Sequence, residues 1–324
     1  MVGRPKIYYE SEEYLEAAAA GEDGKNTDGT EGEGHDRTSI ALPDDQLALV
    51  EAMLGAVKPT AKVVLVLFNG GGLAIEHLMA RTSDMRVHAI VEGFFPGMAG
   101  ATAMAESLYG EANRFSKMPY TLLGEAFTEE SVMKDMSMTD PPGRGYRYYT
   151  GKITIVPFGF GLSYTTFSLK SAGLVDESVS LSASEAAAIS DGARPAGQLR
   201  GASHELTTAS VTVTNTGKIA GDEVVFLFHN ATAATGQWAQ RDGGDGLDPL
   251  AIKQLVAFER VSLAPGESKT VSFPVSVRTL STVDKHGARH ALAGEHGLTF
   301  SRGHGEELGR RLRLRAPEGR VLIG

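Results

Sequence analysis

The chain has 324 residues, which is enough for two ordinary domains that each bury a hydrophobic core. Hydrophobic residues make up 42% and charged residues 22%, proportions that are typical of globular proteins and that exclude a fibrous or wholly disordered chain. The formal net charge of −9 argues against a nucleic-acid partner, because binding to a phosphate backbone needs clustered Lys and Arg.

The sequence contains no cysteine, which excludes disulfides and thiolate metal sites. Its first residues, MVGRPKIYYESEEYLEA, include no apolar segment of signal-peptide length. The longest apolar run, Val63 to Phe68, is too short to cross a bilayer, so no membrane partner is expected. The localisation stays open, since a longer protein with a secretion signal ahead of this chain would be extracellular.

Residues 1–30 are charged and rich in Gly and Ala without a sustained period, which predicts a poorly ordered amino-terminal segment. The pattern becomes regular from Leu42. Pro43 and Asp44 are typical of a helix start, and this helix is expected to pack against a sheet. Its apolar residues recur at helical spacing: Leu47, Val50, Leu54 and Val57.

Two short β-branched runs, each followed by a helical pattern, predict an α/β sandwich with a partial, mostly parallel sheet over residues 31–136. Lys62–Phe68 has the composition of a buried parallel strand and ends in the turn Asn69-Gly70-Gly71-Gly72. This turn lacks the spacing of a phosphate-binding loop. The other expected elements are a strand at Val87–Val91 and helices at Leu73–Ala80 and Ala101–Tyr109.

The remainder of the chain predicts a second, all-β domain. Residues 137–167 are rich in Gly and aromatics without a helical period, so we expect an extended connector there. After a polar stretch from Val175 to Ser203, short strands at close spacing predict a β-sandwich over residues 168–316. These strands are Ala209–Val213, Glu223–Phe228, Gln254–Phe258 and Thr270–Val275.

Four blocks of sequence carry a family resemblance. The first is Glu31-Gly32-Glu33-Gly34-His35-Asp36-Arg37, followed by Leu42-Pro43 and Gln46, and the second is VHAIVEGFFPGMAGATAMAESLYGEANRFSKMPYT. The third joins PGRGYRYY to PFGFGLSYTTF, and the fourth joins VTNTGKIAGDEVVFLF to PLAIKQLVAFERVSLAPGESKTVSF. In this order the blocks resemble glycoside hydrolase family 3. Two places differ from its pattern: Gly-Arg-Leu-Pro is Ser116-Lys117-Met118-Pro119 here, and Gly-Gln-Glu-Gly-Gly is Gly97-Met98-Ala99-Gly100-Ala101.

The resemblance implies both a fold and an activity. The fold would be the family's carboxy-terminal α/β sandwich domain followed by its fibronectin type III-like domain. The activity would be hydrolysis of O-glycosyl bonds with retention and without a cofactor, acting on an oligosaccharide or glycoside. The first and third blocks are most similar to the β-xylosidase-like branch. Expected substrates are therefore β-xylosides, or alternatively β-glucosides, in the catabolism of xylan and other cell-wall polysaccharides.

Retaining glycosidases need two carboxyl groups about 5 Å apart, one as nucleophile and one as acid/base. The resemblance places the acid/base on the first block, at Glu33, with Glu31 as the alternative. It assigns Asp36 and Arg37 to support of this loop by hydrogen bonds. Composition alone instead favours two solvated charges for Glu31 and Glu33.

The family's nucleophile is an aspartate in an amino-terminal barrel, and the resemblance identifies no equivalent here. Ser83-Asp84 is superficially similar to the Ser-Asp pair around such a nucleophile, but its position between a helix and a strand predicts a turn. The chain is therefore expected to carry the acid/base loop only, to be inactive alone, and to need a barrel in cis or in trans. The alternative is a non-catalytic carbohydrate-binding or protein-interaction remnant of such an enzyme.

The nine histidines are scattered and form no HExxH motif. We therefore expect no metal site, and we expect most histidines at the surface.

Overall fold

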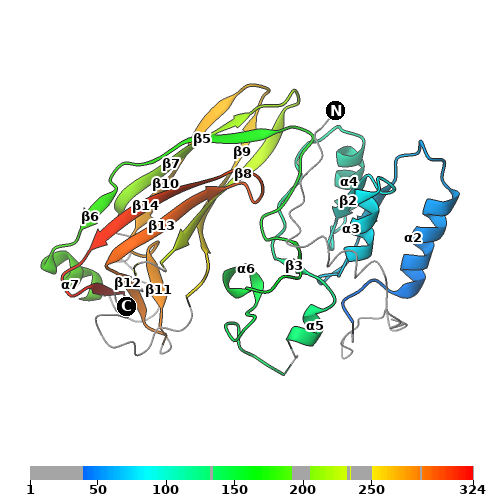
Figure 1. Cartoon of the computed structure of the whole chain (residues 1–324). Coiled ribbons are helices and arrows are strands. Elements are labelled where there is room, and N and C mark those ends of the chain that lie inside the picture. Colours follow the sequence, from blue (N-terminus) through cyan, green and yellow to red (C-terminus); the bar gives the residue numbers. More distant parts are fainter. Residues whose placement is uncertain are drawn as a thin grey trace. The chain divides into compact units, whose positions relative to one another are not determined.

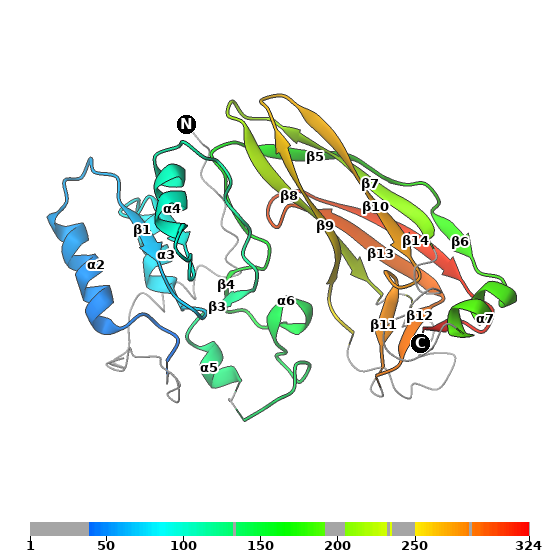
Figure 2. The same cartoon turned by 180° about the vertical axis from the view of Figure 1, so that it is seen from behind.

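The computed structural model describes residues 39–131, 134–191, 205–231, 234, 250–284 and 287–323. The chain divides into two compact units, which are taken one at a time below. Within the described residues, the first unit consists of 39–112, 118–143 and 150–158, and the second of 113–117, 144–149 and 159–323. Figures 1 and 2 show most of the helices in the first unit and the long strands in the second. The predicted fold class, an α/β domain followed by an all-β sandwich, is confirmed.

The first unit is built around a pair of parallel strands. Strand β1 pairs in parallel with β2, with Val64 opposite Ala89 and Leu67 opposite Glu92. The two strands therefore end at the same edge of the sheet. The helices and strands of this unit are α2 (Asp44–Ala56), β1 (Val64–Leu67), α3 (Glu76–Ser83), β2 (Ala89–Glu92), α4 (Gly100–Leu108), β3 (Leu122–Leu123), α5 (Phe127–Glu130) and β4 (Thr154–Val156).

The strand expected at Lys62–Phe68 exists and is parallel, but the expectation that it is buried was wrong. Val64 is 41% exposed and the other residues of β1 are only partly buried. The physical reason is that β2 is the sole strand paired with β1 in the described part of the chain. Helix α2 is also only partly covered by the rest of the unit. Its Leu54 is buried, whereas Leu49 and Met53 are more than half exposed.

The second unit contains two facing sheets. One sheet has the strand order β10-β7-β5 and the other the order β6-β14-β13-β8-β9. A smaller sheet, β11-β12-β15, completes the unit. The strands and helices are α6 (Gly145–Tyr148), β5 (Phe167–Leu174), β6 (Ser178–Ser180), α7 (Ala183–Asp191), β7 (Glu205–Asn215), β8 (Gly221–Asn230), β9 (Gln254–Leu263), β10 (Ser268–Ser276), β11 (Ser281–Val283), β12 (Arg289–Leu292), β13 (Gly294–Ser301), β14 (Glu307–Arg315) and β15 (Arg320–Ile323).

The sandwich core follows from the alternation of side-chain direction along these strands. Val211 on β7 and Leu227 on β8 are completely buried, and their neighbours along each strand point the other way. Phe273 of β10 stacks on Phe300 of β13 with ring centroids 6.3 Å apart, which joins the two large sheets. The four strands expected from the sequence all exist, and each is longer than its apolar run suggested.

The segment 137–167, expected as an extended connector, has regular structure of its own. Its strand β4 pairs with β3 inside the first unit, with Val156 opposite Leu122. Its helix α6 belongs to the second unit, where the Tyr146 ring meets the Phe228 ring edge to face at 6.2 Å. Residues 1–30, expected to be poorly ordered, lie outside the described residues.

No helix in the described part of the chain has the length and apolarity needed to cross a membrane.

Candidate functional site

The carboxyl ends of β1 and β2 carry a polar cluster. Asn69 follows β1, and its Nδ2 donates to both carboxylate oxygens of Glu92, at 2.9 and 3.1 Å. Oε1 of Glu92 also accepts a hydrogen bond from the backbone N–H of Phe94 at 3.2 Å. Glu92 thus ties together the two loops that leave this edge of the sheet. In α/β proteins such an edge is where ligands usually bind.

Two aromatic rings cover the glycines of these loops. A Cβ on Gly70 would collide with the ring of Phe95, and a Cβ on Gly93 would lie 3.0 Å from the ring of Phe68. Each loop therefore needs a glycine where the other loop's ring lies over it. Phe68 is 59% exposed and Phe95 79% exposed.

The chain immediately after the predicted acid/base loop is fixed in place. The Ile40 N–H donates to Oε2 of Glu125 at 3.0 Å, and the Ile40 carbonyl accepts from Ala74 at 2.7 Å. Ala41 and Ala74 form a parallel β-bridge. Glu125 is in turn held by Glu76, whose carboxylate accepts from the Glu125 N–H at 2.7 Å and is almost fully buried. Residues 40 and 41 therefore have a single, well-supported position in the first unit.

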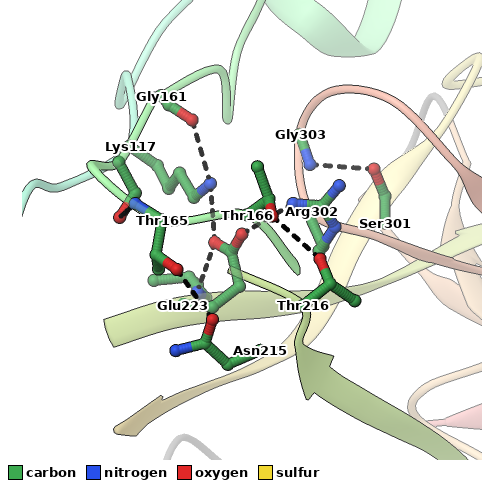
Figure 3. Close-up of polar contacts among 12 residues, drawn as sticks. Lys117, Gly161, Thr165, Thr166, Asn215, Thr216, Glu223, Ser301, Arg302 and Gly303 are labelled. Atoms are coloured by element: carbon green, nitrogen blue, oxygen red, sulfur yellow. Dashed lines mark hydrogen bonds and ion pairs between the residues drawn. The ribbon is translucent and has the colours of Figure 1, made fainter. Parts of the chain in front are cut away.

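The second unit holds a buried ion cluster (Figure 3). Lys117 and Arg302 lie on either side of Glu223, with Lys117 Nζ 2.7 Å from Oε1 and Arg302 Nη1 2.9 Å from Oε2. Side-chain exposure is 10% or less for all three residues. Lys117 Nζ also donates to the Gly161 carbonyl at 3.2 Å. Because both carboxylate oxygens are occupied by cations, this cluster can position the chain but offers no free acid or base.

Burial dominates the electrostatics of this cluster. It lowers the pKa of Lys117, although the Glu223 carboxylate acts in the opposite direction. Burial, together with the charges of Lys117 and Arg302, also lowers the pKa of His304 to about 4. Beside the cluster, Thr165 donates to Oδ1 of Asn215 at 2.7 Å, as Figure 3 shows.

Two further histidines form a pair inside the sandwich. His229 Nε2 lies 2.9 Å from His296 Nδ1, and the rings stack at 5.1 Å. His296 Nε2 lies 2.8 Å from the carbonyl oxygen of Leu292, which can only accept. The geometry therefore assigns a proton to Nε2 of His296, which leaves its Nδ1 to accept the Nε2–H of His229. Burial lowers the pKa of both rings, that of His229 to about 3.

The expectation that most histidines lie at the surface was wrong. Among the six described histidines, His229, His290 and His296 are buried and the other three are partly buried. His290 Nε2 contacts Asp284 Oδ2 at 2.8 Å. Within the described residues, no group of three or more His, Asp or Glu has the arrangement of a metal site.

Two family models match separate parts of the chain. The model of the glycosyl hydrolase family 3 C-terminal domain matches residues 16–164, and that of the fibronectin type III-like domain matches residues 245–302. The chain is 34% identical over 287 residues to β-D-xylosidase 1 of Arabidopsis thaliana, an alignment that covers 83% of this chain. It is 32% identical over 272 residues to exo-1,4-β-xylosidase bxlB of Emericella nidulans, again over 83% of this chain.

The chain belongs to glycoside hydrolase family 3. It spans about a third of the length of the curated relatives it matches, 34% of the Arabidopsis protein and 32% of the Emericella protein. Solved family 3 structures share its fold. One is an exo-β-xylosidase in complex with a xylobiose aziridine probe, with a TM-score of 0.70 and 24% identity over 90% of this chain and 35% of that one. Another is the β-D-glucoside glucohydrolase of Trichoderma reesei, with a TM-score of 0.68 and 22% identity over 86% of this chain and 37% of that one.

The residues expected to form the family 3 acid/base loop, Glu31, Glu33, Asp36 and Arg37, lie outside the described residues. Their assignment therefore stays a prediction. What the structure adds is the anchorage of the chain at Ile40 and Ala41, directly after them. The Ser83-Asp84 pair forms a turn, since Ser83 ends α3 and Asp84 Oδ1 accepts the backbone N–H of Arg86 at 2.9 Å.

Sequence reasoning missed several residues that fix these regions. Nothing in the spacing of Glu76, Glu92 and Glu125 distinguishes them from surface carboxylates, because their partners are distant along the chain. Lys117 could have been found from the sequence, because it occupies the arginine position of the family's Gly-Arg-Leu-Pro. The positive charge at this position forms an ion pair with Glu223.

Proposed function

We propose that this chain is the carboxy-terminal part of a retaining β-glycosidase that acts on β-xylosides, with β-glucosides as the alternative. The biological role proposed is the breakdown of xylan and related cell-wall polysaccharides. The observation that carries this proposal is the 34% identity to a protein named β-D-xylosidase 1, extending over 83% of the chain. In this proposal the chain supplies the acid/base loop, and a barrel domain in cis or in trans supplies the nucleophile.

The proposed chemistry uses one carboxyl group of this chain twice. In the first step an aspartate of the barrel attacks the anomeric carbon, while the Glu33 carboxylic acid gives its proton to the departing glycosidic oxygen. In the second step the Glu33 carboxylate takes a proton from water as that water attacks the same carbon and releases the aspartate. Glu33 thereby regains its proton, and the configuration at the anomeric carbon is retained.

The anchorage of residues 40 and 41 supports this role. An acid/base group must stay within a fraction of an ångström of its productive position, so its loop needs a rigid attachment. Ile40 is attached by hydrogen bonds to Glu125 and Ala74, and Ala41 by a β-bridge to Ala74. These contacts hold the carboxy-terminal root of the predicted loop in the α/β unit.

The proposal is tested by fusing this chain to a barrel domain of the family. The chain is fused behind the amino-terminal part of the Arabidopsis β-D-xylosidase 1, and hydrolysis of xylobiose and of dinitrophenyl β-xyloside is measured. The fusion is expected to hydrolyse both substrates and the chain alone neither. Glu33→Gln should reduce kcat/KM on xylobiose by roughly 10²- to 10⁴-fold. The loss on dinitrophenyl β-xyloside should be much smaller, because that leaving group departs without a proton.

Matched variants separate chemistry from folding. Azide, which needs no general base, should restore turnover of the dinitrophenyl substrate by Glu33→Ala and produce a xylosyl azide. Glu31→Gln, the same substitution two residues away, should retain most activity. Loss in Glu31→Gln instead of Glu33→Gln would transfer the role to Glu31, and loss in neither would refute the loop assignment. A fusion that never hydrolyses, while the chain binds xylan, would favour the non-catalytic alternative.

A further inference from the structure

The outer face of the five-stranded sheet carries a row of arginines on β14. Residues of β14 alternate between the two faces of the sheet, and Leu312 and Leu314 lie in the sandwich core. Arg311, Arg313 and Arg315 therefore point away from the core, and all three are exposed. Successive members of the row are about 7 Å apart, the distance of two residues along a strand. Figure 1 shows β14 between β6 and β13, away from the edge of its sheet.

The strands on both sides of the row present small residues. On β6, Ser178 lies opposite Arg313 and Ser180 opposite Arg315. On β13, Gly297 lies opposite Arg311. Because Ser178, Ser180 and Gly297 are short, the arginines stand above a surface with serine hydroxyls along one side. On β13 the one longer side chain beside the row is Glu295, opposite Arg313. A flat polymer that bears hydroxyl groups can lie on such a surface.

The positive charge of the row is largely uncompensated. Arg311 is 83% exposed and lies 3.9 Å from Glu295, a weak and solvated ion pair. Among the described residues, no carboxylate lies within ion-pair distance of the Arg313 or Arg315 guanidinium. Glu295 is directly opposite Arg313 in the register and is the acidic residue of this face on β13. Three arginines in line therefore face solvent on a chain whose formal net charge is −9.

We propose that this arginine row is a secondary binding surface for a carboxylate-bearing polysaccharide, a xylan with uronic acid side groups. Guanidinium groups form paired hydrogen bonds with carboxylates, and the neighbouring serines match sugar hydroxyls. A polysaccharide with few carboxylates per unit length can bind through its contacts with the arginine row alone. A densely charged nucleic acid would be repelled by the net negative charge of the chain, which is −9.

The choice of a polysaccharide rests on the proposed glycosidase function, whereas the choice of an anion rests on the arginines alone. The surface would hold the enzyme on its polymeric substrate, and it takes no part in bond cleavage. Its binding can be measured with the chain as it is, without a barrel and without turnover. Failure of this proposal and failure of the glycosidase proposal are therefore distinguishable.

The experiment measures retardation of the chain in native gels that contain glucuronoxylan, at physiological ionic strength. The expected result is retardation that disappears when the same polymer has its carboxyl groups reduced to alcohols. The triple variant Arg311→Gln/Arg313→Gln/Arg315→Gln should bind about tenfold or more weakly, since exposed charge pairs contribute up to about 1 kcal/mol each. Binding should also weaken steeply with added salt.

The control variant removes three positive charges from residues outside the arginine row. Lys58, Lys62 and Lys218 are exposed lysines outside the row, and their triple substitution by Gln should leave binding unchanged. In the barrel fusion, the arginine triple variant should hydrolyse dinitrophenyl β-xyloside at the rate of the parent. Equal binding to the carboxyl-reduced polymer, equal loss in the lysine control, or tighter binding of duplex DNA than of glucuronoxylan at the arginine row would each overturn the proposal.

Discussion

A stacked pair of neutral histidines lies in the sandwich interior, where a charge would be costly. His229 donates to His296, and His296 donates to the Leu292 carbonyl, so the hydrogen bonds of the pair depend on a neutral His296. A proton on Nδ1 of His296 would remove the acceptor that His229 uses. Burial lowers the pKa of both rings, that of His229 to about 3. The pair therefore makes the stability of the sandwich depend on pH.

The first prediction is loss of stability in acid. An unfolded histidine binds a proton below its ordinary pKa of 6.5, but native His229 does so only near 3, so the unfolded state gains protons first. The contribution of His229 to the free energy of unfolding should be constant well above pH 6.5 and fall as the pH drops through 6.5 toward 3. At pH 4.5, about two units below the ordinary value, His229 alone should cost about 2–3 kcal/mol. Urea denaturation at a series of pH values measures this.

The comparison that isolates the pair is the double variant His229→Leu/His296→Gln, in which the glutamine amide can still donate to Leu292. Carboxylate titrations are common to both proteins and cancel in the difference. The variant's curve should fall less steeply between pH 6.5 and pH 4. If the two curves stay parallel over that range, the histidine pair is not the source of the acid sensitivity.

At the residue scale, the family resemblance allowed a catalytic residue to be predicted from the sequence, but the side-chain contacts could not be predicted. Glu33 was assigned because its loop matches a family block, and it stays a prediction. The hydrogen bonds of Glu92 and Glu125 depend on partners 23 and 85 residues away, and no local pattern encodes them. His290 and His296 were missed because their strands, β12 and β13, were not predicted from the sequence. His296 shares a face of β13 with the buried Leu298 and Phe300.

At the scale of elements, the Lys117–Glu223–Arg302 cluster attaches an isolated segment to the sandwich. Lys117 belongs to the short stretch 113–117, which is counted with the second unit although residues on both sides of it belong to the first. Asn113 has the same function: its Oδ1 accepts from Ser163 and its Nδ2 donates to the Ala220 carbonyl. Side chains at the two ends of this stretch thus hold it against β8.

The second prediction concerns Glu223→Gln. This change leaves two buried cations facing each other without a carboxylate, and breaking a buried ion network in this way costs about 3–5 kcal/mol. Lys117→Met should cost clearly less, because burial already disfavours the charged lysine and the Glu223–Arg302 pair remains. Chemical denaturation of the full chain measures both values.

Glu259→Gln is the matched control for that measurement. It removes one carboxylate from an ion pair with Lys269 at a similar distance, 3.0 Å, but that pair is exposed. The control should change the free energy of unfolding by less than about 1 kcal/mol. Equal effects of Glu223→Gln and Glu259→Gln would mean that the cluster contributes no more than a surface pair does.

Elements with a strong period were predictable, and short or polar ones were not. All four expected sandwich strands exist, because each has a short run of alternating or β-branched apolar residues bounded by turns. Helix α7 was missed in a stretch noted only as polar, although Ser182 and Glu185 form a capping box there, with the Ser182 N–H donating to the Glu185 carboxylate at 2.8 Å. Strand β14 was missed although Arg311 to Arg315 alternate arginine with leucine, a period-two signal.

At the scale of the whole molecule, the sequence placed the start of the sandwich domain at residue 168, where the aromatic and Gly-rich segment ends. The structure adds residues 144–149 and 159–167 to the second unit. Tyr146 lies over Phe228, and Gly159 approaches Phe226 so closely that a Cβ would lie 3.0 Å from the ring. These segments cover the face of β8 that points away from the core. This packing could not be predicted, because the aromatic and Gly-rich sequence of the segment has no helical or strand period.

The last prediction follows from that cover. A fragment of residues 168–324 loses Tyr146 and Gly159 and exposes Phe226 and Phe228, which are 5% and 2% exposed in the chain. Exposing a buried phenylalanine costs about 1.5–3 kcal/mol, so this fragment should be several kcal/mol less stable than a fragment of residues 144–324. It should also bind a hydrophobic dye that the longer fragment does not bind. Tyr146→Ala in the longer fragment should give an intermediate stability, because it uncovers Phe228 alone. If both fragments unfold at the same urea concentration, the segments before residue 168 are a passive connector, and the boundary predicted from the sequence is the physical one.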